Sequence, residues 1–333
     1  MNSDKPVALV TGAATGIGRS VAVALAKSGY DVVINFSRSE EAAKITARDV
    51  EAAGARPLLF RCDVSDDTCV RAMLAATEKE FGRLDVLINN AGTTVDVEPK
   101  NLEAMKVEDW NRVFNVNVLG LFLVTRAAVP LLKKSPNGCI VNTCSIAGLR
   151  PSVQPLPYAA SKAASDHLVR TYAATFGVDA LVVRPFNNYG PRQNDQQYAG
   201  VIPTMLKCAF EGGVFTIFGD GQQTRDYVYV TDTVRAALDL YKCPQARGKV
   251  VNIGSGQEIS IIDLKTKIEH ILSRPIPTEH REPRPGDVRR HRADITLLKS
   301  FIGFEQWISI DEGLARAVEF YRQRADYNLT GVR

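Results

Sequence analysis

The chain has 333 residues, a formal net charge of +4, and 45% hydrophobic and 23% charged residues. These values are ordinary for a folded globular protein, so they exclude a disordered or fibrous chain and give no support for a nucleic-acid partner. The length allows one or two domains with a substantial core.

Six cysteines show no CxxC pair and no histidine at zinc-ligand spacing, so we predict reduced thiols and no metal site. The first residues lack the charged and apolar segments of a signal peptide, and no uninterrupted run of about 18 apolar residues occurs. We therefore expect a cytoplasmic protein with no membrane partner. A basic stretch at 281–292 is either a solvated face or a site for an anionic small substrate.

Short apolar runs alternate with helical patterns over the first half of the chain, which predicts βαβ units and a parallel sheet. In chain order we expect strands at 6–10, 31–36, 57–60, 84–88, 139–142 and 180–184. We expect helices at 17–28, 40–53, 67–81 and 158–176, and a long helical segment that breaks near 115–117. This pattern predicts an α/β fold with a Rossmann-type doubly wound parallel sheet of six or seven strands.

The composition changes after Pro185 to irregular segments rich in Gly, Pro and aromatic residues. Helices are expected again from Ser260, a suitable N-cap, and over 311–322. We therefore predict a cofactor-binding Rossmann domain at 1–185 and a smaller C-terminal substrate-binding lobe at 186–333. The apolar segment 250–253 is a candidate for an additional strand of the main sheet.

A glycine-rich turn lies between the first expected strand and the first helix, in the sequence TGAATGIG. Glycine lets the backbone approach a pyrophosphate, and a helix N-terminus offers free N–H groups and partial positive charge to it. We therefore predict that a dinucleotide is held by Gly12, Thr15, Gly16, Ile17 and Gly18.

The end of the second strand bears on which dinucleotide is used. Ser37 and Arg38 follow this strand, where NAD enzymes commonly carry an acidic residue for the ribose 2′-hydroxyl. A hydroxyl and a guanidinium suit a 2′-phosphate, so NADP is slightly favoured over NAD. The alternative for Arg38 is a solvated residue at the start of the next helix.

Tyr158 and Lys162 are four residues apart in an expected helix and therefore share one face. A free tyrosine has a pKa of about 10, and a neighbouring ammonium lowers it towards the range of a useful base. Ser145 follows the strand that ends at Asn142 and can hydrogen-bond the same substrate oxygen. The three predict proton exchange with an alcohol or carbonyl while a nicotinamide carries the hydride. By itself, a YxxxK match is more often part of a surface helix.

Taken in order, TGAATGIG, NNAG, Ser145 and YAASK resemble the short-chain dehydrogenase/reductase superfamily in its classical branch. The resemblance implies that Asp63 and Val64 lie beside the adenine, and that Asn117 joins a proton relay with Lys162. The alternative for Asn117 is a helix-kink residue. The resemblance also implies a homodimer and a cofactor channel lined by Asn90, Ala91, Gly92, Tyr158 and Lys162.

From Tyr158 onward the chain resembles the extended branch, namely the nucleotide-sugar epimerases and dehydratases. The matching segments are RPFNNYGPRQ, GDGQQTRDYVYV, NIGSG and RPGDV. The resemblance implies that Asn187, Arg225 and Arg284 hold a nucleotide diphosphate, and Arg supplies the paired donors that a diphosphate needs. Considered alone, each Arg is more often part of a loop salt bridge than a ligand contact.

The N-terminal half departs from the pattern of the extended branch in three features. These are its glycine spacing, the short interval from Ser145 to Tyr158, and the expected cofactor. The chain therefore resembles a hybrid, with an N-terminal part of the classical branch joined near 157–164 to a C-terminal part of the extended branch. A natural recombinant, an engineered chimera and a generated sequence would all have this pattern.

The leading hypothesis is hydride transfer at a hydroxyl or ketone of a nucleotide-diphosphate sugar, by a 4-epimerase or a 4-ketoreductase. Ile146 and Ala147 stand where the dehydratases carry an acidic pair, which disfavours 4,6-dehydration. One alternative is a classical NADPH-dependent carbonyl reductase that resembles the 3-oxoacyl-acyl-carrier-protein reductases. Another is a nucleotide-binding scaffold without turnover.

Overall fold

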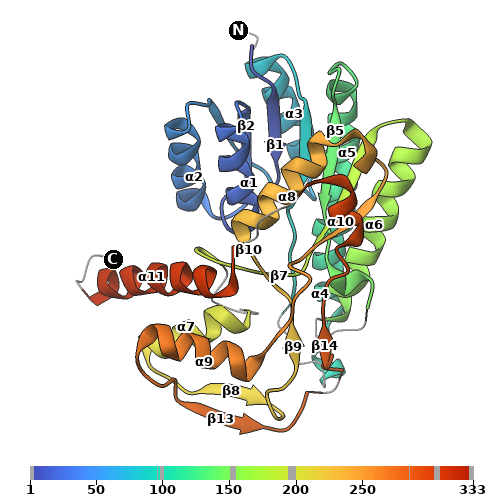
Figure 1. Cartoon of the computed structure of the whole chain (residues 1–333). Coiled ribbons are helices and arrows are strands. Elements are labelled where there is room, and N and C mark those ends of the chain that lie inside the picture. Colours follow the sequence, from blue (N-terminus) through green and yellow to red (C-terminus); the bar gives the residue numbers. More distant parts are fainter. Residues whose placement is uncertain are drawn as a thin grey trace.

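A parallel sheet of seven strands forms the centre of the larger lobe (Figure 1). The computed structural model describes residues 4–95, 97, 101–150, 155–193, 200–284, 286–303 and 308–324, and the backbone of the last helix to Leu329. In spatial order the strands are β11 (Val250–Ile253), β6 (Asp179–Pro185), β5 (Cys139–Thr143), β4 (Val86–Asn89), β1 (Val7–Val10), β2 (Asp31–Phe36) and β3 (Pro57–Arg61). The predicted α/β Rossmann fold is confirmed.

Helices cover both faces of the sheet, which is why every residue of β1, β2 and β4 is buried and the strands show no alternation of buried and exposed positions. One buried cluster joins the sheet to α1 (Gly16–Lys27), α2 (Glu40–Ala52), α8 (Val230–Lys242) and α10 (Thr296–Phe301). A second joins the opposite face to α3 (Asp67–Phe81), α5 (Leu121–Leu132) and α6 (Leu156–Phe176). The strand order reverses between β1 and β4, and ligands of such sheets bind at this point.

The predicted break of the helix near 115–117 is wrong, because the backbone stays helical there. The helix is continuous from α4 (Val107–Phe114) through a π-helical segment, η2 (Asn115–Gly120), into α5. A π turn accommodates an irregular sequence without ending the helix and is frequent at functional sites.

Residues 107–132 are long and apolar enough to cross a membrane by length and composition, but half of the most apolar window is buried inside the chain. That burial is typical of a core helix.

The second lobe has its own buried cluster, formed by α7 (Val201–Glu211), α9 (Ile261–Leu272) and α11 (Ile310–Leu329) with a pair of parallel strands. Those strands are β8 (Phe215–Phe218) and β13 (Thr278–Arg281). Ser260 caps α9 as predicted, because its Oγ accepts a hydrogen bond from the Asp263 amide at 3.0 Å. The description of the segment after Pro185 as irregular is wrong for 201–211 and 230–242, which form α7 and α8.

Short strands connect the lobes. They are β7 (Asn187–Tyr189) with β10 (Tyr227–Tyr229), and β9 (Thr224–Arg225) with β12 (Ile259–Ser260) and β14 (Arg290–His291). The remaining short helices are η1 (Leu102–Ala104), η3 (Ile146–Gly148) and η4 (Pro244–Ala246).

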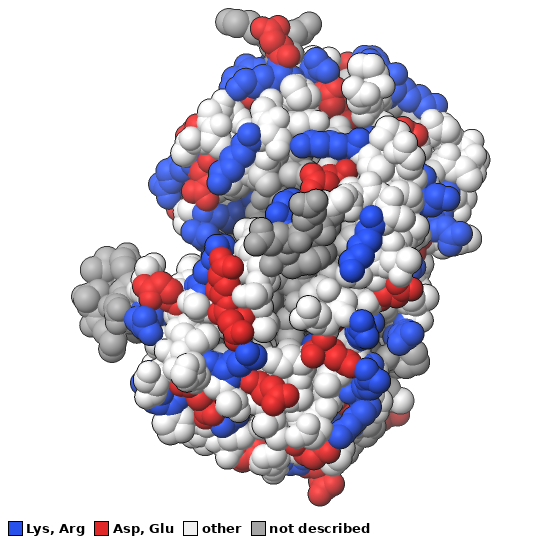
Figure 2. Space-filling view, in the orientation of Figure 1, with Lys and Arg blue, Asp and Glu red and all other residues white. Residues whose placement is uncertain are grey.

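The division at 185/186 remains a prediction, although part of the second half packs with the first. The segment 250–253 forms β11 and pairs with β6 in the main sheet, and α8 packs against α1. Figure 2 shows Lys and Arg side chains interspersed with Asp and Glu on the face in view.

Candidate active site

The glycine-rich turn after β1 is fixed by side chains from two neighbouring strands. Thr11 Oγ1 accepts hydrogen bonds from the amides of Asn90 and Ala91, at 2.9 and 3.0 Å, and Asn90 Nδ2 donates to the Thr11 carbonyl at 3.0 Å. Asn35, buried in β2, accepts from the Gly12 amide at 3.2 Å. The TGAATGIG and NNAG motifs therefore form one structure at the switch point of the sheet.

The first turn of α1 is free to receive an anion. Its N-cap, Thr15, makes no side-chain cap, and the turn contains no acidic residue. Gly16 has a φ of +55° with nothing within 4 Å of an added Cβ, whereas a Cβ on Gly18 would overlap the Gly12 carbonyl oxygen. These residues and the partly buried Ile17 fit a pyrophosphate held by backbone N–H groups.

Ser37 and Arg38 are exposed just beyond β2, where the sequence predicts a contact with the 2′ position of the ribose. Sequence reasoning missed Arg61, the last residue of β3, whose Nε donates to the Ser37 carbonyl at 3.2 Å. The pairing of β2 with β3 brings Arg61 to this position, and no local pattern indicates it.

The loop after β3 contains the predicted adenine-side residues. Asp63 is exposed, and its Oδ1 accepts from the amide and hydroxyl of Ser65 at 3.0 and 2.7 Å. Val64 is buried against the π turn, so closely that a Cβ on Gly120 would lie 2.6 Å from Val64 Cγ2.

Ser145, Tyr158 and Lys162 line the same cavity. Ser145 Oγ accepts from the Ala147 amide at 3.2 Å and so begins the short helix η3. A Cβ on Gly148 would lie 2.6 Å from the Ala163 amide nitrogen, so η3 is packed directly on α6. Lys162 is buried, and its Nζ donates to the Thr143 carbonyl at 3.0 Å and lies 5.8 Å from the centroid of the Tyr158 ring.

Asn117 lies behind these residues in the π turn. Its Oδ1 accepts from the Thr93 amide at 2.8 Å, and its Nδ2 donates to the Thr93 carbonyl and to Ser161 Oγ at 3.0 and 2.9 Å. Both Asn117 Oδ1 and Lys162 Nζ are close to Gly92, at 3.5 and 3.7 Å from the position of an added Cβ. Within the described residues no direct hydrogen bond joins Asn117 to Lys162, so the relay stays a prediction.

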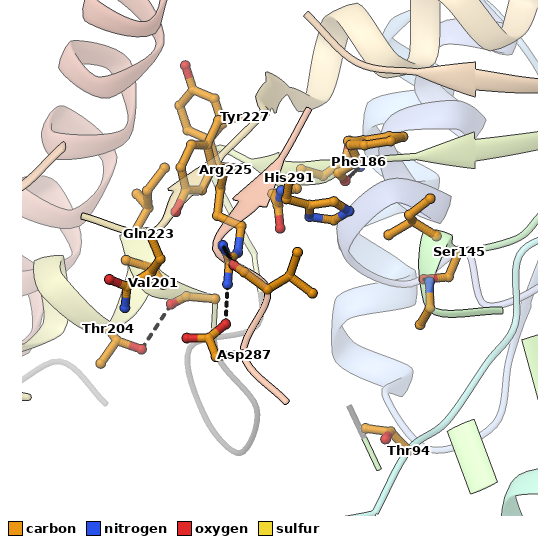
Figure 3. A pocket seen from close by; sticks show the side chains of 18 of the residues that line it. Thr94, Ser145, Phe186, Val201, Thr204, Gln223, Arg225, Tyr227, Asp287 and His291 are labelled. Atoms are coloured by element: carbon orange, nitrogen blue, oxygen red, sulfur yellow. Dashed lines mark hydrogen bonds and ion pairs between the residues drawn. The ribbon is translucent and has the colours of Figure 1, made fainter. Parts of the chain in front are cut away.

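The cavity has a volume of about 1290 Å³ and extends from the ends of the sheet strands into the second lobe. Figure 3 shows Ser145 and Thr94 on one side, Arg225 with Asp287 on the other, and His291 between them. Asn90 and Gly92 line it near Ser145, and Asn187 and Arg284 line it with Arg225. The residues predicted for hydride transfer and those predicted for diphosphate binding therefore share one site.

Arg225 is held in place by its neighbours. Its guanidinium forms an ion pair with Asp287 and donates to the Thr224 and Val288 carbonyls at 2.8 and 2.7 Å. Arg284 lies with its guanidinium carbon 3.7 Å from the centroid of the Phe218 ring. Asn187, which also lines the cavity, donates from its Nδ2 to the Asp226 carbonyl at 2.8 Å.

Asp226 anchors this end of the cavity and was not singled out from the sequence. Its fully buried carboxylate accepts from the Ser255 amide and hydroxyl at 2.8 and 2.7 Å, and from the Gly256 and Ala293 amides at 2.9 and 3.1 Å. Burial raises the pKa of Asp226, and these donors oppose that effect. The residue ties the strand that carries Arg225 to the loop after β11.

His291 is a second cavity residue that the sequence did not identify. Its ring lies tilted on Phe186, with the two centroids 5.0 Å apart. Burial, followed by the charges of Arg225 and Arg150, lowers the pKa of His291 to about 4, so the imidazole is neutral at pH 7.

The basic stretch 281–292 divides between the cavity and the surface. Arg281, Arg284 and His291 line the cavity, and a site for an anionic ligand there stays a prediction. Arg289 and Arg290 instead form exposed ion pairs with Asp220 and Glu258.

Comparison with protein families gives two matches that meet near the predicted joint. The short chain dehydrogenase family matches residues 6–185, and the GDP-mannose 4,6 dehydratase family matches residues 150–317. The two matches confirm the hybrid resemblance inferred from the motifs.

The curated relatives divide in the same way. A 3-oxoacyl-[acyl-carrier-protein] reductase of Synechocystis is 38% identical over 182 residues, which are 54% of this chain and 72% of the relative. A UDP-glucose 4-epimerase of Mycolicibacterium smegmatis is 29% identical over an alignment of 331 positions that covers 95% of this chain and 99% of the relative.

Solved structures of epimerases share the fold along nearly the whole chain. The UDP-glucose 4-epimerase of Thermotoga maritima with UDP-glucose has a TM-score of 0.78 at 24% identity, covering 96% of this chain and 99% of that one. The UDP-glucuronic acid 4-epimerase of Bacillus cereus, in complex with UDP-glucuronic acid and NAD, has a TM-score of 0.77 at 23% identity with the same coverage.

Proposed function

The chain belongs to the short-chain dehydrogenase family and is an NAD(P)-dependent enzyme, and from this we propose that it transfers hydride at C4 of a nucleotide-diphosphate sugar, as a 4-epimerase or 4-ketoreductase. The observation that carries the proposal is the shared cavity. Ser145, Tyr158 and Lys162 line it together with Arg225 and Arg284. A simple ketone has no diphosphate for the two arginines to bind.

Proton exchange in this mechanism is assigned to Tyr158. As a phenolate it takes the proton from the C4 hydroxyl while the C4 hydrogen leaves as hydride, so that the C–O single bond becomes a carbonyl. Ser145 donates a hydrogen bond to the same oxygen, and the ammonium of Lys162 lies 5.8 Å from the centroid of the Tyr158 ring. Bound nicotinamide supplies the hydride acceptor and, in the reverse step, the hydride donor.

Epimerisation requires the 4-keto sugar to present its other face before hydride and proton return. The cavity of about 1290 Å³ has to receive the nicotinamide end of the cofactor as well as the sugar nucleotide, since Asn90 and Gly92 line it together with Arg225. Ketoreduction needs only the second half of the cycle, with the ketone supplied from outside.

Calorimetric titration with UDP, dTDP and GDP sugars, with NAD or NADP present, tests the proposal. We expect micromolar binding of at least one of them, weakened about 10- to 100-fold by Arg225→Ala or Arg284→Ala, because each removes charge-assisted donors to the diphosphate. Arg289→Ala is the matched control, since Arg289 belongs to the same basic stretch but pairs with Asp220 on the surface. Loss of affinity in the control variant to the same extent would contradict the assignment.

The second candidate function is an NADPH-dependent carbonyl reductase. The reductase relatives and the short interval from Ser145 to Tyr158 favour it. Absence of sugar-nucleotide binding together with oxidation of NADPH by simple keto esters would support this candidate and exclude the first.

For the cofactor we propose a slight preference for NADP. Support comes from Ser37, Arg38 and Arg61 at the ends of β2 and β3, where two guanidiniums and a hydroxyl suit a 2′-phosphate. Replacing Arg38 or Arg61 by Ala is expected to raise the Kd for NADP about tenfold and to leave the Kd for NAD unchanged, as measured by nucleotide fluorescence. Equal changes for the two cofactors would count against the preference.

A further inference from the structure

Arg150 is a charged residue of the cavity to which neither the motifs nor the proposed reaction gives a role. It follows η3, and its amide donates to the Ile146 carbonyl at 3.2 Å. Because η3 begins at Ser145 and is packed on α6 through Gly148, the backbone at Arg150 is fixed relative to Ser145 and Lys162.

The Arg150 guanidinium is exposed and, among the residues that the structure describes, forms no hydrogen bond or ion pair with a carboxylate. The other arginines of the cavity have partners of their own, since Arg225 and Arg284 are assigned to the diphosphate and Arg281 pairs with Glu279. Basic side chains outnumber acidic ones in the cavity lining. The basic residues are Arg150, Lys162, Arg225, Arg281 and Arg284, and the acidic residues are Glu282 and Asp287. Positive charge therefore remains at Arg150 for a second anionic group besides the diphosphate.

His291 lies within electrostatic reach of Arg150 and supplies a neutral partner. Its pKa is depressed first by burial and then by Arg225 and Arg150, so at pH 7 its ring carries no charge of its own. Both residues line the cavity, so an anion that reaches both would receive charge-assisted donors from the guanidinium and one N–H from the imidazole.

We propose that Arg150 selects a nucleotide sugar that carries a carboxylate beside the reacting carbon, that is, a hexuronate. In a hexuronate the carboxylate is attached to C5, the neighbour of C4, and Arg150 is five residues from Ser145 and lines the same cavity. The inference rests on the proposed function and narrows it to acidic sugars.

Calorimetry with UDP-glucose and UDP-glucuronic acid, on the protein saturated with its cofactor, tests the inference. We expect the glucuronate to bind at least about tenfold more tightly than glucose, and Arg150→Ala to raise the glucuronate Kd about 10- to 100-fold with the glucose Kd changed less than about twofold. Arg150→Lys should retain part of the preference. Arg48→Ala, an exposed arginine of α2 outside the cavity, should change neither value.

Equal affinity for the two sugar nucleotides, or an equal loss of affinity for both in Arg150→Ala, would overturn the inference. The proposed function would still stand in that case if UDP-glucose binds and its binding depends on Arg225. Failure of every sugar nucleotide to bind, in wild type as in the variants, would instead refute the proposed function and this inference with it.

Discussion

Replacing Tyr158 by Phe is expected to lower kcat about 10²- to 10⁴-fold and to leave cofactor and sugar-nucleotide binding unchanged. The variant keeps the ring beside Lys162 but lacks the hydroxyl that exchanges the proton, so the loss belongs to chemistry and not to binding. Steady-state turnover and calorimetry on the same preparation separate the two.

Tyr172→Phe is the matched control for this change. Tyr172 is on the same helix, α6, where it contacts Phe122 and Phe176 and does not line the cavity. Its hydroxyl has no role in the proposed reaction, so turnover should be unchanged. A Tyr158→Phe variant with every measured property of the wild type would favour a nucleotide-binding scaffold without turnover.

Gly18→Ala is expected to abolish measurable NAD(P) binding and to destabilise the fold by about 1–3 kcal/mol, the usual range for overpacking. The new methyl would overlap the Gly12 carbonyl oxygen and lie 2.5 Å from Asn90 Nδ2, so the turn that receives the pyrophosphate would have to move. Fluorescence titration with each dinucleotide and thermal unfolding measure the two effects.

Gly29→Ala separates this clash from the general cost of losing a glycine. Gly29 has a φ of +89° and nothing within 4 Å of an added Cβ, and it lies after α1 and away from the turn. We expect a loss of about 1 kcal/mol with the cofactor Kd unchanged. Tight cofactor binding by Gly18→Ala would show that this turn does not hold the dinucleotide.

Local signals made much of the larger lobe predictable. The bounds of β2 and α3 agree with the sequence prediction, because β2 is built around the apolar residues 32–34 and Asp66 caps α3 by accepting from the amides of Thr68 and Cys69. The glycine turn and the YAASK helix were located by the same kind of evidence, since each is encoded within about ten residues.

Features that depend on distant parts of the chain were missed. The partner of Arg225 is Asp287, 62 residues away, and Asp226 is bonded to residues 29 and 67 positions further on. The depressed pKa of His291 arises from burial and from two arginines on other elements. Pairings between distant residues leave no periodic pattern in a single sequence. The helix α8 is a different case, because it has a regular amphipathic pattern but its segment was interpreted from its motifs alone.

The return of the chain to the main sheet limits how the protein can be divided. A fragment that ends at residue 185 would lack β11 and α8, so β6 would become an open sheet edge and the apolar face of α1 would lose its cover. Open edges of this kind template aggregation. A joint near 157–164 places β6 and β11 in the same part of the chain, so that the pairing of the two strands lies within the C-terminal part. A joint at 185/186 would instead divide this pairing between the two parts.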